Sequence, residues 1–232
     1  MTNPMQLPLP LFDGEPVGFD ITSQLERLIT DITRSCPRFA HIDPSRLVVS
    51  CATARSRSRH GKYASIFPLR FEGGSDKQLT RRTTWYLPNV RIDDRDALYS
   101  LFFYIPRFLI LDGARRLTVV FHELFHINDK FDGDLRRFPS YFSYHGKSVR
   151  QFEEAFTPDV EAYISSGRPR RFETLLEYSM SKMLQRYGAI SFRRSRQPRL
   201  SRRPETWTIR GSERTGVIEA VSAATRRLAA AG

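Results

Sequence analysis

Five consecutive residues, His122-Glu123-Leu124-Phe125-His126, have the types and the spacing that a metal-dependent hydrolytic site requires. They lie in an apolar stretch that predicts a helix, so His122 and His126 should project from one face with Cβ atoms about 5–6 Å apart. That separation allows both imidazoles to bind one zinc ion. Glu123 should lie about 100° around the helix, where it can reach a water on the metal without being a ligand. The pattern predicts metal-assisted hydrolysis, usually of a peptide bond.

The same segment has a plainer interpretation, an amphipathic core helix with two incidental histidines. Buried polar groups need partners, and His, Glu and His are poor choices for a helix otherwise made of Val, Phe, Leu and Ile. We therefore favour the zinc interpretation.

A catalytic zinc ion needs a third protein ligand and one open position. His145 follows His126 by 19 positions, after a stretch that contains Asp132-Gly133 and Pro139 and predicts a loop. We rank His145 first, because a loop can bring it back over the motif helix just before a second helix begins. Carboxylates remain alternatives, those of the second helix ahead of those in the loop: Glu153, Glu154, Asp132 and Asp134.

Other side chains are candidates for supporting roles around the metal. Asp129 and Asp132 are placed to accept the free N–H of a ligand imidazole. Tyr144, beside His145, is a candidate second donor to the oxyanion. Tyr86 or Tyr104 could line the cleft, although core packing is the expected role of either.

The motif and its continuation resemble the SprT-like and phage-type zinc metallopeptidases. The features that carry the resemblance are His-Glu-Leu-Phe-His, a loop, His145-Gly146 and then the aromatic Phe152, within about residues 98–156. The resemblance implies that His122, His126 and His145 bind Zn²⁺ and that Glu123 is the general base.

One departure from that pattern concerns cysteine. Bacterial SprT-like proteins often carry a C-terminal zinc ribbon with four cysteines, whereas this chain has only Cys36 and Cys51, both before the motif. The roles that the ribbon serves in that family therefore do not carry over to this chain.

The surrounding patterns predict an α+β fold. In chain order they indicate a helix over 20–34, strands over 46–55, 63–71, 83–87 and 102–111, the motif helix over 114–130 capped by Asp112, and a second helix over 148–156. The first two strands are expected to form a long-armed hairpin. This is the order of the small zincin-like domain, in which a mixed sheet packs on the motif helix. An edge strand lines the cleft in that fold and can pair with extended substrate, and the candidates are the strands at 102–111 and 83–87.

The chain is predicted to have three parts: an irregular N-terminal arm over 1–19, the zincin-like metallopeptidase domain over 20–165, and a basic, helical and flexible C-terminal extension over 166–232. Within the extension we expect a helix over 172–187, a flexible basic linker over 190–203 and a short helix over 216–231.

A net charge of +12 favours an anionic partner, most often nucleic acid. The arginines cluster in two stretches, Arg55, Arg57 and Arg59, and then Arg193, Arg194, Arg196, Arg199, Arg202 and Arg203. The lead function is a zinc metallopeptidase acting on a protein or peptide. The alternatives are a DNA- or RNA-binding protein in which the zincin scaffold is only structural, a DNA-associated protease, and a hydrolase of another amide.

The composition also excludes several classes of protein. No stretch approaches the roughly 20 apolar residues of a membrane span, and the first residues lack the pattern of a secretory signal. Two cysteines give no disulfide framework. We therefore expect a cytoplasmic protein with no membrane partner.

Overall fold

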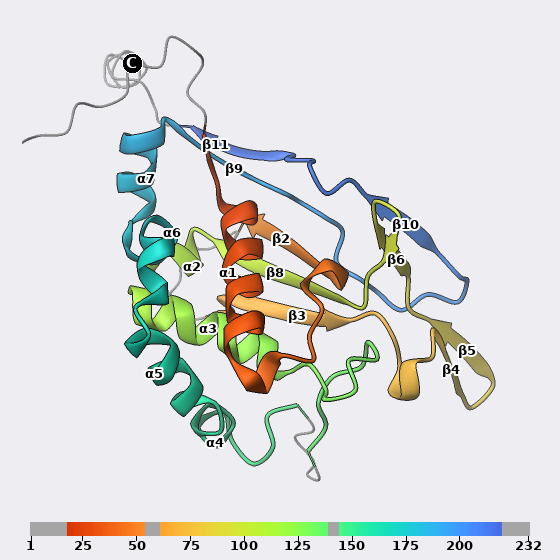
Figure 1. The fold of residues 1–232 in the computed structure, drawn as a ribbon. Coiled ribbons are helices and arrows are strands. Elements are labelled where there is room, and N and C mark those ends of the chain that lie inside the picture. Colours follow the sequence, from red (N-terminus) through yellow and green to blue (C-terminus); the bar gives the residue numbers. More distant parts are fainter. Residues whose placement is uncertain (1–17, 54–60, 139–143, 220–232) are drawn as a thin grey trace, which may run out of the picture.

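The computed structural model describes residues 18–53, 61–138 and 144–219, and it has a mixed α/β fold (Figure 1). Within those ranges the helices are α1 (Ile21–Ser35), α2 (Arg107–Ile110), α3 (Gly113–Phe125), α4 (Val149–Glu154), α5 (Thr157–Ser165), α6 (Glu173–Glu177) and α7 (Met180–Tyr187), with 3-10 turns η1 (Pro37–Phe39), η2 (Pro44–Arg46), η3 (Glu72–Gly74) and η4 (Arg168–Phe172). The strands are β1 (Phe19–Asp20), β2 (Leu47–Thr53), β3 (Ala64–Pro68), β4 (Lys77–Thr80), β5 (Thr83–Tyr86), β6 (Asn89–Ile92), β7 (Arg95–Asp96), β8 (Tyr99–Ile105), β9 (Ala189–Phe192), β10 (Thr206–Ile209) and β11 (Gly216–Glu219).

The central sheet has the order β2-β8-β3. β8 is parallel to β2 and antiparallel to β3, with Leu101 opposite both Val49 and Ile66. The predicted hairpin of the strands at 46–55 and 63–71 is therefore wrong, because β8 lies between β2 and β3. Neither candidate for the cleft edge is the edge of this sheet, since β8 is paired on both sides and the strand at 83–87 pairs with β4 in a separate ribbon. The edge strand next to α3 is β3.

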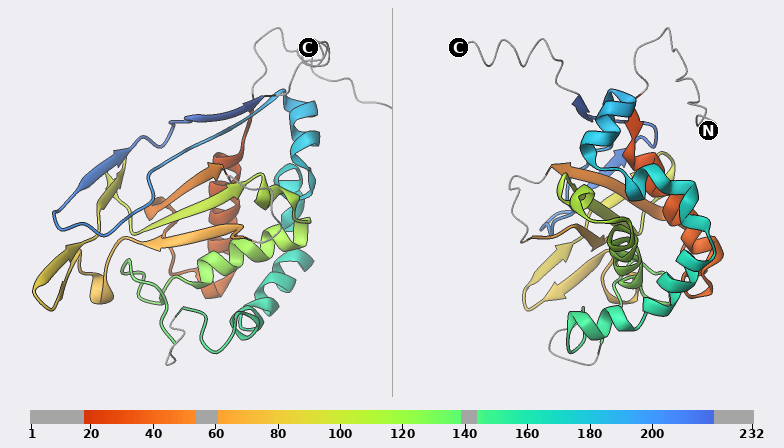
Figure 2. Two further views of the ribbon diagram at one scale, coloured as in Figure 1. Left: turned by 180° about the vertical axis from the view of Figure 1, so that it is seen from behind. Right: turned by 90° about the vertical axis from the view of Figure 1, so that its left-hand side faces the viewer.

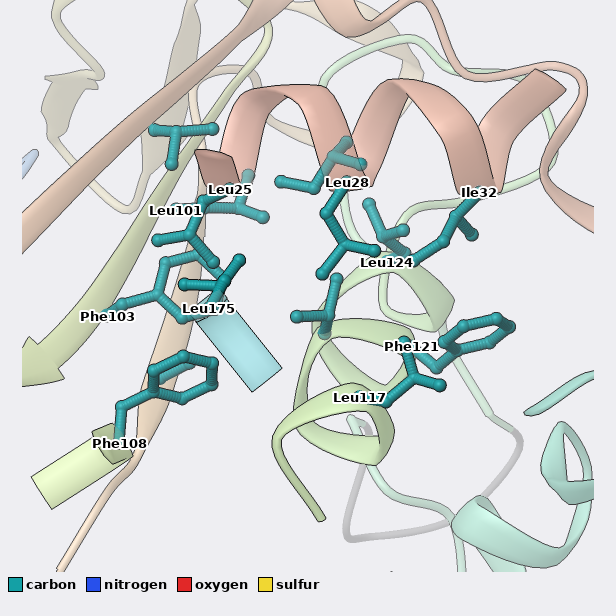
Figure 3. Close-up of a cluster of buried hydrophobic side chains, with 14 of the residues drawn as sticks. Leu25, Leu28, Ile32, Leu101, Phe103, Phe108, Leu117, Phe121, Leu124 and Leu175 are labelled. Atoms are coloured by element: carbon teal, nitrogen blue, oxygen red, sulfur yellow. The ribbon is translucent and has the colours of Figure 1, made fainter. Parts of the chain in front are cut away.

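One face of this sheet carries the main core. Alternate residues of β2 and β8, such as Val49 and Leu101, point to the same side as the apolar stripes of α1 and α3. Figure 3 shows these stripes meeting: Leu25, Leu28 and Ile32 from α1, Leu117, Phe121 and Leu124 from α3, and Leu101 and Phe103 from β8. Burial of this stripe holds α3, and with it the His-Glu-x-x-His motif, against the sheet.

Side-chain and backbone hydrogen bonds explain where α3 begins and where it ends. At the start, the Asp112 side chain accepts a hydrogen bond from the Arg115 backbone N–H at 2.8 Å, which confirms the predicted cap. At the end, Arg136 returns to the helix: its Nε donates to the Phe125 carbonyl at 2.9 Å and its backbone N–H to the His126 carbonyl at 2.6 Å. These donors satisfy the last carbonyls of the helix, so the helix ends at Phe125 and not at residue 130 as predicted.

The region after residue 165 shares this core. Leu175, Met183 and Ile190 belong to the same buried cluster as α1 and α3, and β9 pairs with β1 at the start of the described chain. The predicted single helix over 172–187 is divided into η4, α6 and α7, because Tyr178 is extended and Ser179 caps a new helix. Buried Arg116 supports this break by donating to the Leu175 and Tyr178 carbonyls at 2.7 and 2.8 Å.

Three further predictions differ from the structure. The strand at 102–111 ends at Ile105, because Pro106 is the N-cap of α2. The flexible linker predicted over 190–203 begins instead with β9, followed by Arg193, which is only 2% exposed.

Gly216–Glu219 form β11, so the helix predicted over 216–231 is wrong at its start, and its remainder lies outside the described residues. Residues 1–17 of the predicted arm and the arginines at 55, 57 and 59 also lie outside them.

A second, smaller β region lies beyond the C-terminal end of β3, on the side of the molecule opposite α4–α7 (Figures 1 and 2). It contains the β4–β5 ribbon and the sheet β10-β6-β7. A small buried cluster of Val48, Leu69, Val90 and Ala97 attaches it to the other face of the central sheet. Among the helices of the described ranges, none has the length and apolar character needed to cross a lipid bilayer.

Candidate metal centre

Three histidines from two separate segments meet at the end of α3. His122 lies in the last turn of α3, His126 is its C-cap, and His145 lies just before α4. The Nε2 atom of His122 is 3.1 Å from Nε2 of His145 and 3.2 Å from Nε2 of His126. Each residue directs one ring nitrogen to a common point, and the three together could hold a metal ion.

The structure distinguishes His145 from the carboxylates that were alternatives for the third position. Glu154 pairs with Arg150 at 2.8 Å, and Asp134 pairs with Arg137 at 2.9 Å. Asp132 accepts a hydrogen bond from Asn128 Nδ2 at 2.6 Å. Each of these carboxylates therefore already has a partner outside the histidine cluster, and none belongs to the group that could hold a metal.

Glu153 occupies a different position from the one weighed in the sequence. Its Oε1 lies 3.4 Å from Nδ1 of His122, on the opposite side of the ring from the cluster. A carboxylate there fixes the ring orientation and directs the lone pair of Nε2 toward the shared point. The prediction that Asp129 and Asp132 play this part is wrong, since Asp129 pairs with Arg136 at 2.7 Å. Sequence spacing could not identify Glu153 as a partner of His122, because the contact depends on how α4 returns over α3.

An aromatic wall surrounds the three imidazoles. The Phe152 ring centroid lies 4.9 Å from that of His122, 4.5 Å from His126 and 5.0 Å from His145. This desolvation lowers the pKa of His122 to about 4 and that of His126 to about 3, with the neighbouring imidazoles adding to the effect. The pKa of His145 is lowered as well, chiefly by burial. Neutral imidazoles with free lone pairs are the form that binds metal ions.

One buried atom of the centre has no partner. Nδ1 of His126 is buried and makes no hydrogen bond to the residues that the structure describes. If Nε2 faces a metal ion, Nδ1 carries the proton.

Glu123 lies beside the cluster and is only 6% exposed. Burial raises the pKa of its carboxyl to about 7, although a backbone hydrogen bond from Ile66 and the charge of Lys62 favour the ionised form. The contact with Ile66 joins the motif helix to strand β3. A carboxyl with a pKa near neutrality can both accept and release a proton.

The histidines and Glu123 open into a cavity of about 750 Å³ between β3 and α3. Its walls include all five residues of β3 together with Val119, Tyr144 and Val149. Tyr86 and Tyr104, which were considered as cleft residues, are elsewhere: Tyr86 pairs with Ser201, and the Tyr104 hydroxyl accepts from Gln197 Nε2 at 3.1 Å. Tyr63 and Tyr144 are the tyrosines that line the cavity.

Alternate residues of strand β3 direct their backbone groups away from β8, and the strand lines the cavity. The Tyr104 N–H donates to the Tyr63 carbonyl at 2.9 Å. Hydrogen-bonded residues alternate along an antiparallel pair, so Ser65 and Phe67 also bond to β8. Ala64 and Ile66 lie between them and direct their backbone groups away from β8. Pro68 also faces away from β8, so the N–H that proline lacks removes no hydrogen bond between β3 and β8.

The chain was compared with known proteins in three ways. No protein-family model matches it, no curated protein matches it, and no solved structure matches it.

Proposed function

We propose that this protein is a zinc-dependent peptidase with a zincin-like fold, in which His122, His126 and His145 hold Zn²⁺ and Glu123 is the general base. One observation carries the proposal: the Nε2 atoms of His122, His126 and His145 converge within a cavity that also contains the buried carboxyl of Glu123. A core helix with incidental histidines would not be expected to recruit a third imidazole from a distant loop.

The donor set fits zinc. Zinc binds imidazole nitrogen at about 2.0–2.1 Å with tetrahedral geometry, which places neighbouring ligand nitrogens about 3.3 Å apart. The observed Nε2 separations of 3.1 and 3.2 Å are close to that value. When bound, the ion would supply Lewis-acid polarisation of a carbonyl and an acidified water.

The protein's own groups have defined tasks in this proposal. Glu123 accepts the proton of the attacking water and later delivers it to the leaving amine. Its near-neutral pKa and its contact with Ile66 suit it for both transfers. Glu153 positions His122, and Phe152 keeps water from the far side of the ligand rings. Tyr144, half-exposed at the cavity wall, remains our candidate for a second donor to the oxyanion.

The free edge of β3 supports an extended peptide as substrate. A peptide strand can add to an exposed sheet edge by main-chain hydrogen bonds. The outward backbone groups of Ala64 and the carbonyl of Ile66 are placed for that pairing, and the Ile66 N–H contacts Glu123. A peptide bound along this edge therefore passes directly by the general base.

The experiment combines metal content with turnover. Purified wild-type protein should hold about one zinc per chain after gel filtration and should cleave a panel of unfolded proteins. Glu123→Gln should keep the metal and lose about 10²–10⁴-fold in rate. Glu161→Gln, an exposed change on α5, is the matched control and should behave as wild type. A Glu123→Gln protein with full activity, or a wild-type protein that takes up no zinc on reconstitution, would overturn the proposal.

A further inference from the structure

Much of the net positive charge of the chain lies in the small β region and the segment that leads into it, although β7 and the turn before it add Asp93, Asp94 and Asp96. Residues 77–91 and 194–210 together contain ten Lys and Arg residues and a single carboxylate, Glu205. The whole chain has a net charge of +12, so these two stretches, fewer than 40 residues, hold most of the excess. Such a density of one charge is the electrostatic feature of a surface that meets a polyanion.

Most arginines of this region are exposed and lack acidic partners, with Arg91, which pairs with Asp96 at 3.5 Å, as the exception. Arg81, Arg82, Arg199, Arg202 and Arg203 are all exposed, and among the described residues no carboxylate lies within ion-pair distance of any of them.

Arginines elsewhere in the molecule are often paired. Arg38 contacts Asp159 at 2.5 Å, and Arg168 and Arg171 both contact Asp31, at 3.2 and 3.1 Å. Internal pairing therefore neutralises part of the positive charge on the helical side, whereas in the β region most arginines other than Arg91 have no carboxylate partner among the described residues.

Both tryptophans of the chain lie among these arginines. The guanidinium of Arg196 lies 4.6 Å from the ring centroid of Trp207, and that of Arg202 lies 5.8 Å from the ring of Trp85. The second pairing follows from register, since Tyr86 bridges Ser201 and so places Trp85 opposite Arg202. Both rings are only partly buried.

A shallow cavity of about 540 Å³ adjoins Trp207. It is lined by Arg196, Arg199, Leu200, Ser201 and Glu205, and Leu200 is 55% exposed. The surface thus combines planar cations, an indole, a small apolar contact and a hollow of roughly the size of a nucleotide.

We propose that this arginine–tryptophan surface, defined by Arg81, Arg82, Arg196, Arg199, Arg202, Arg203, Trp85 and Trp207, binds single-stranded nucleic acid. Arginines meet the phosphates, and indole and guanidinium planes provide faces on which unpaired bases stack. An acidic protein would use the charge but would leave the aromatic–guanidinium stacks without a partner. The proposal stands on residues outside the metal centre and does not depend on the proposed peptidase activity.

The test uses intrinsic fluorescence, because both tryptophans of the chain belong to the surface. The full-length protein is titrated with oligothymidine of about 20 nucleotides in about 0.1 M salt, and tryptophan emission and anisotropy of a labelled oligonucleotide are followed. We expect binding that quenches tryptophan emission and weakens as salt increases. Absence of binding, or binding without a change in tryptophan emission, would overturn the proposal.

Matched charge variants locate the surface. The variant with Arg199→Glu, Arg202→Glu and Arg203→Glu should bind at least about tenfold more weakly. The control carries the same change of net charge on exposed arginines of the helical side, Arg34→Glu, Arg115→Glu and Arg170→Glu, and should stay within about threefold of wild type. Equal losses in both variants would mean that net charge alone attracts the oligonucleotide, and the assignment of the surface would fail.

A third arm separates nucleic acid from polyanions in general. Trp85→Ala should weaken oligothymidine binding about tenfold, because one stacked base is lost, and should leave the binding of inorganic polyphosphate unchanged. If polyphosphate binds as tightly as oligothymidine and Trp85→Ala alters neither, the surface recognises charge only and the nucleic-acid assignment is wrong.

Discussion

The metal centre and the arginine–tryptophan surface use polar residues in opposite ways. At the metal centre His126 and Glu123 are buried and His122 and His145 are partly buried, and the Phe152 ring packs against all three imidazoles. On the β region Arg81, Arg82, Arg199, Arg202 and Arg203 are exposed, and no carboxylate of the described residues forms an ion pair with them, although Arg91 pairs with Asp96 at 3.5 Å. Buried polar groups act by precise position, whereas exposed charges act by their number and by long-range attraction. The two regions should therefore respond to mutation independently and by different amounts.

Removal of a metal ligand should have the largest effect. His126→Ala should weaken metal binding by about a hundredfold to a thousandfold, because it removes one of only three protein ligands that share the binding free energy. Metal affinity is measured by competition with a chromogenic chelator. Oligothymidine binding by the same variant should equal that of wild type. Parallel loss of both properties would show that the two regions are coupled.

A contrast between two arginines separates structural from surface roles. Arg193 is buried, and its Nη1 donates to Glu26 at 2.5 Å and to the Val49 carbonyl at 2.9 Å. Arg193→Ala leaves these acceptors without a donor and should lower the free energy of unfolding by about 2–5 kcal/mol. Arg202→Ala, at an exposed site, should change it by less than about 0.5 kcal/mol. Urea denaturation measures both, and similar values for the two variants would contradict this division of roles.

Glu153 and Glu154 are neighbours with different tasks, and they give a sharper test of the metal centre. Glu153→Gln weakens the contact with Nδ1 of His122 and should reduce metal affinity about 10- to 100-fold. Glu154→Gln removes only an exposed pair with Arg150 and should leave metal affinity unchanged. If the two variants have equal affinities, Glu153 does not position the ligand.

The smallest expected effect is on the acid stability of the metal-free protein. Burial lowers the pKa of His122 to about 4 and of His126 to about 3, so the folded state stays neutral where the unfolded chain binds protons, below about 6.5. Stability should therefore fall as pH is lowered from about 6.5 toward about 4. Glu123 opposes this, because its pKa of about 7 lets the folded state hold a proton that the unfolded chain releases above about 4.5.

Glu123→Gln should accordingly lose stability more steeply than wild type between about pH 7 and pH 5. Calorimetry in the presence of a chelator measures the two profiles, with Glu161→Gln as the control. A shallower profile for Glu123→Gln would contradict the protonation of Glu123 in the folded state.

Local patterns were enough to predict many of the elements. The apolar spacing of Ile21, Leu25 and Leu28 predicted α1, and Asp112 was correctly predicted to cap α3. Predictions failed where distant contacts override local preference. The motif helix ends early because Arg136, eleven residues beyond Phe125, binds its last carbonyls. The expected linker after β9 contains a buried arginine because α1 supplies Glu26 as its partner.

The sequence by itself determined that His122, Glu123 and His126 share one end of an apolar helix, since helical periodicity fixes that relation. Only the tertiary structure decided that His145 completes the cluster, that Glu153 contacts His122 on the side of the ring away from the cluster, and that β3 is the edge strand of the central sheet in the described part of the chain. The physical reason is the range of the interactions. Periodicity acts within a few residues, whereas the return of a loop and the insertion of β8 between β2 and β3 depend on burying apolar surface shared by segments far apart in the chain.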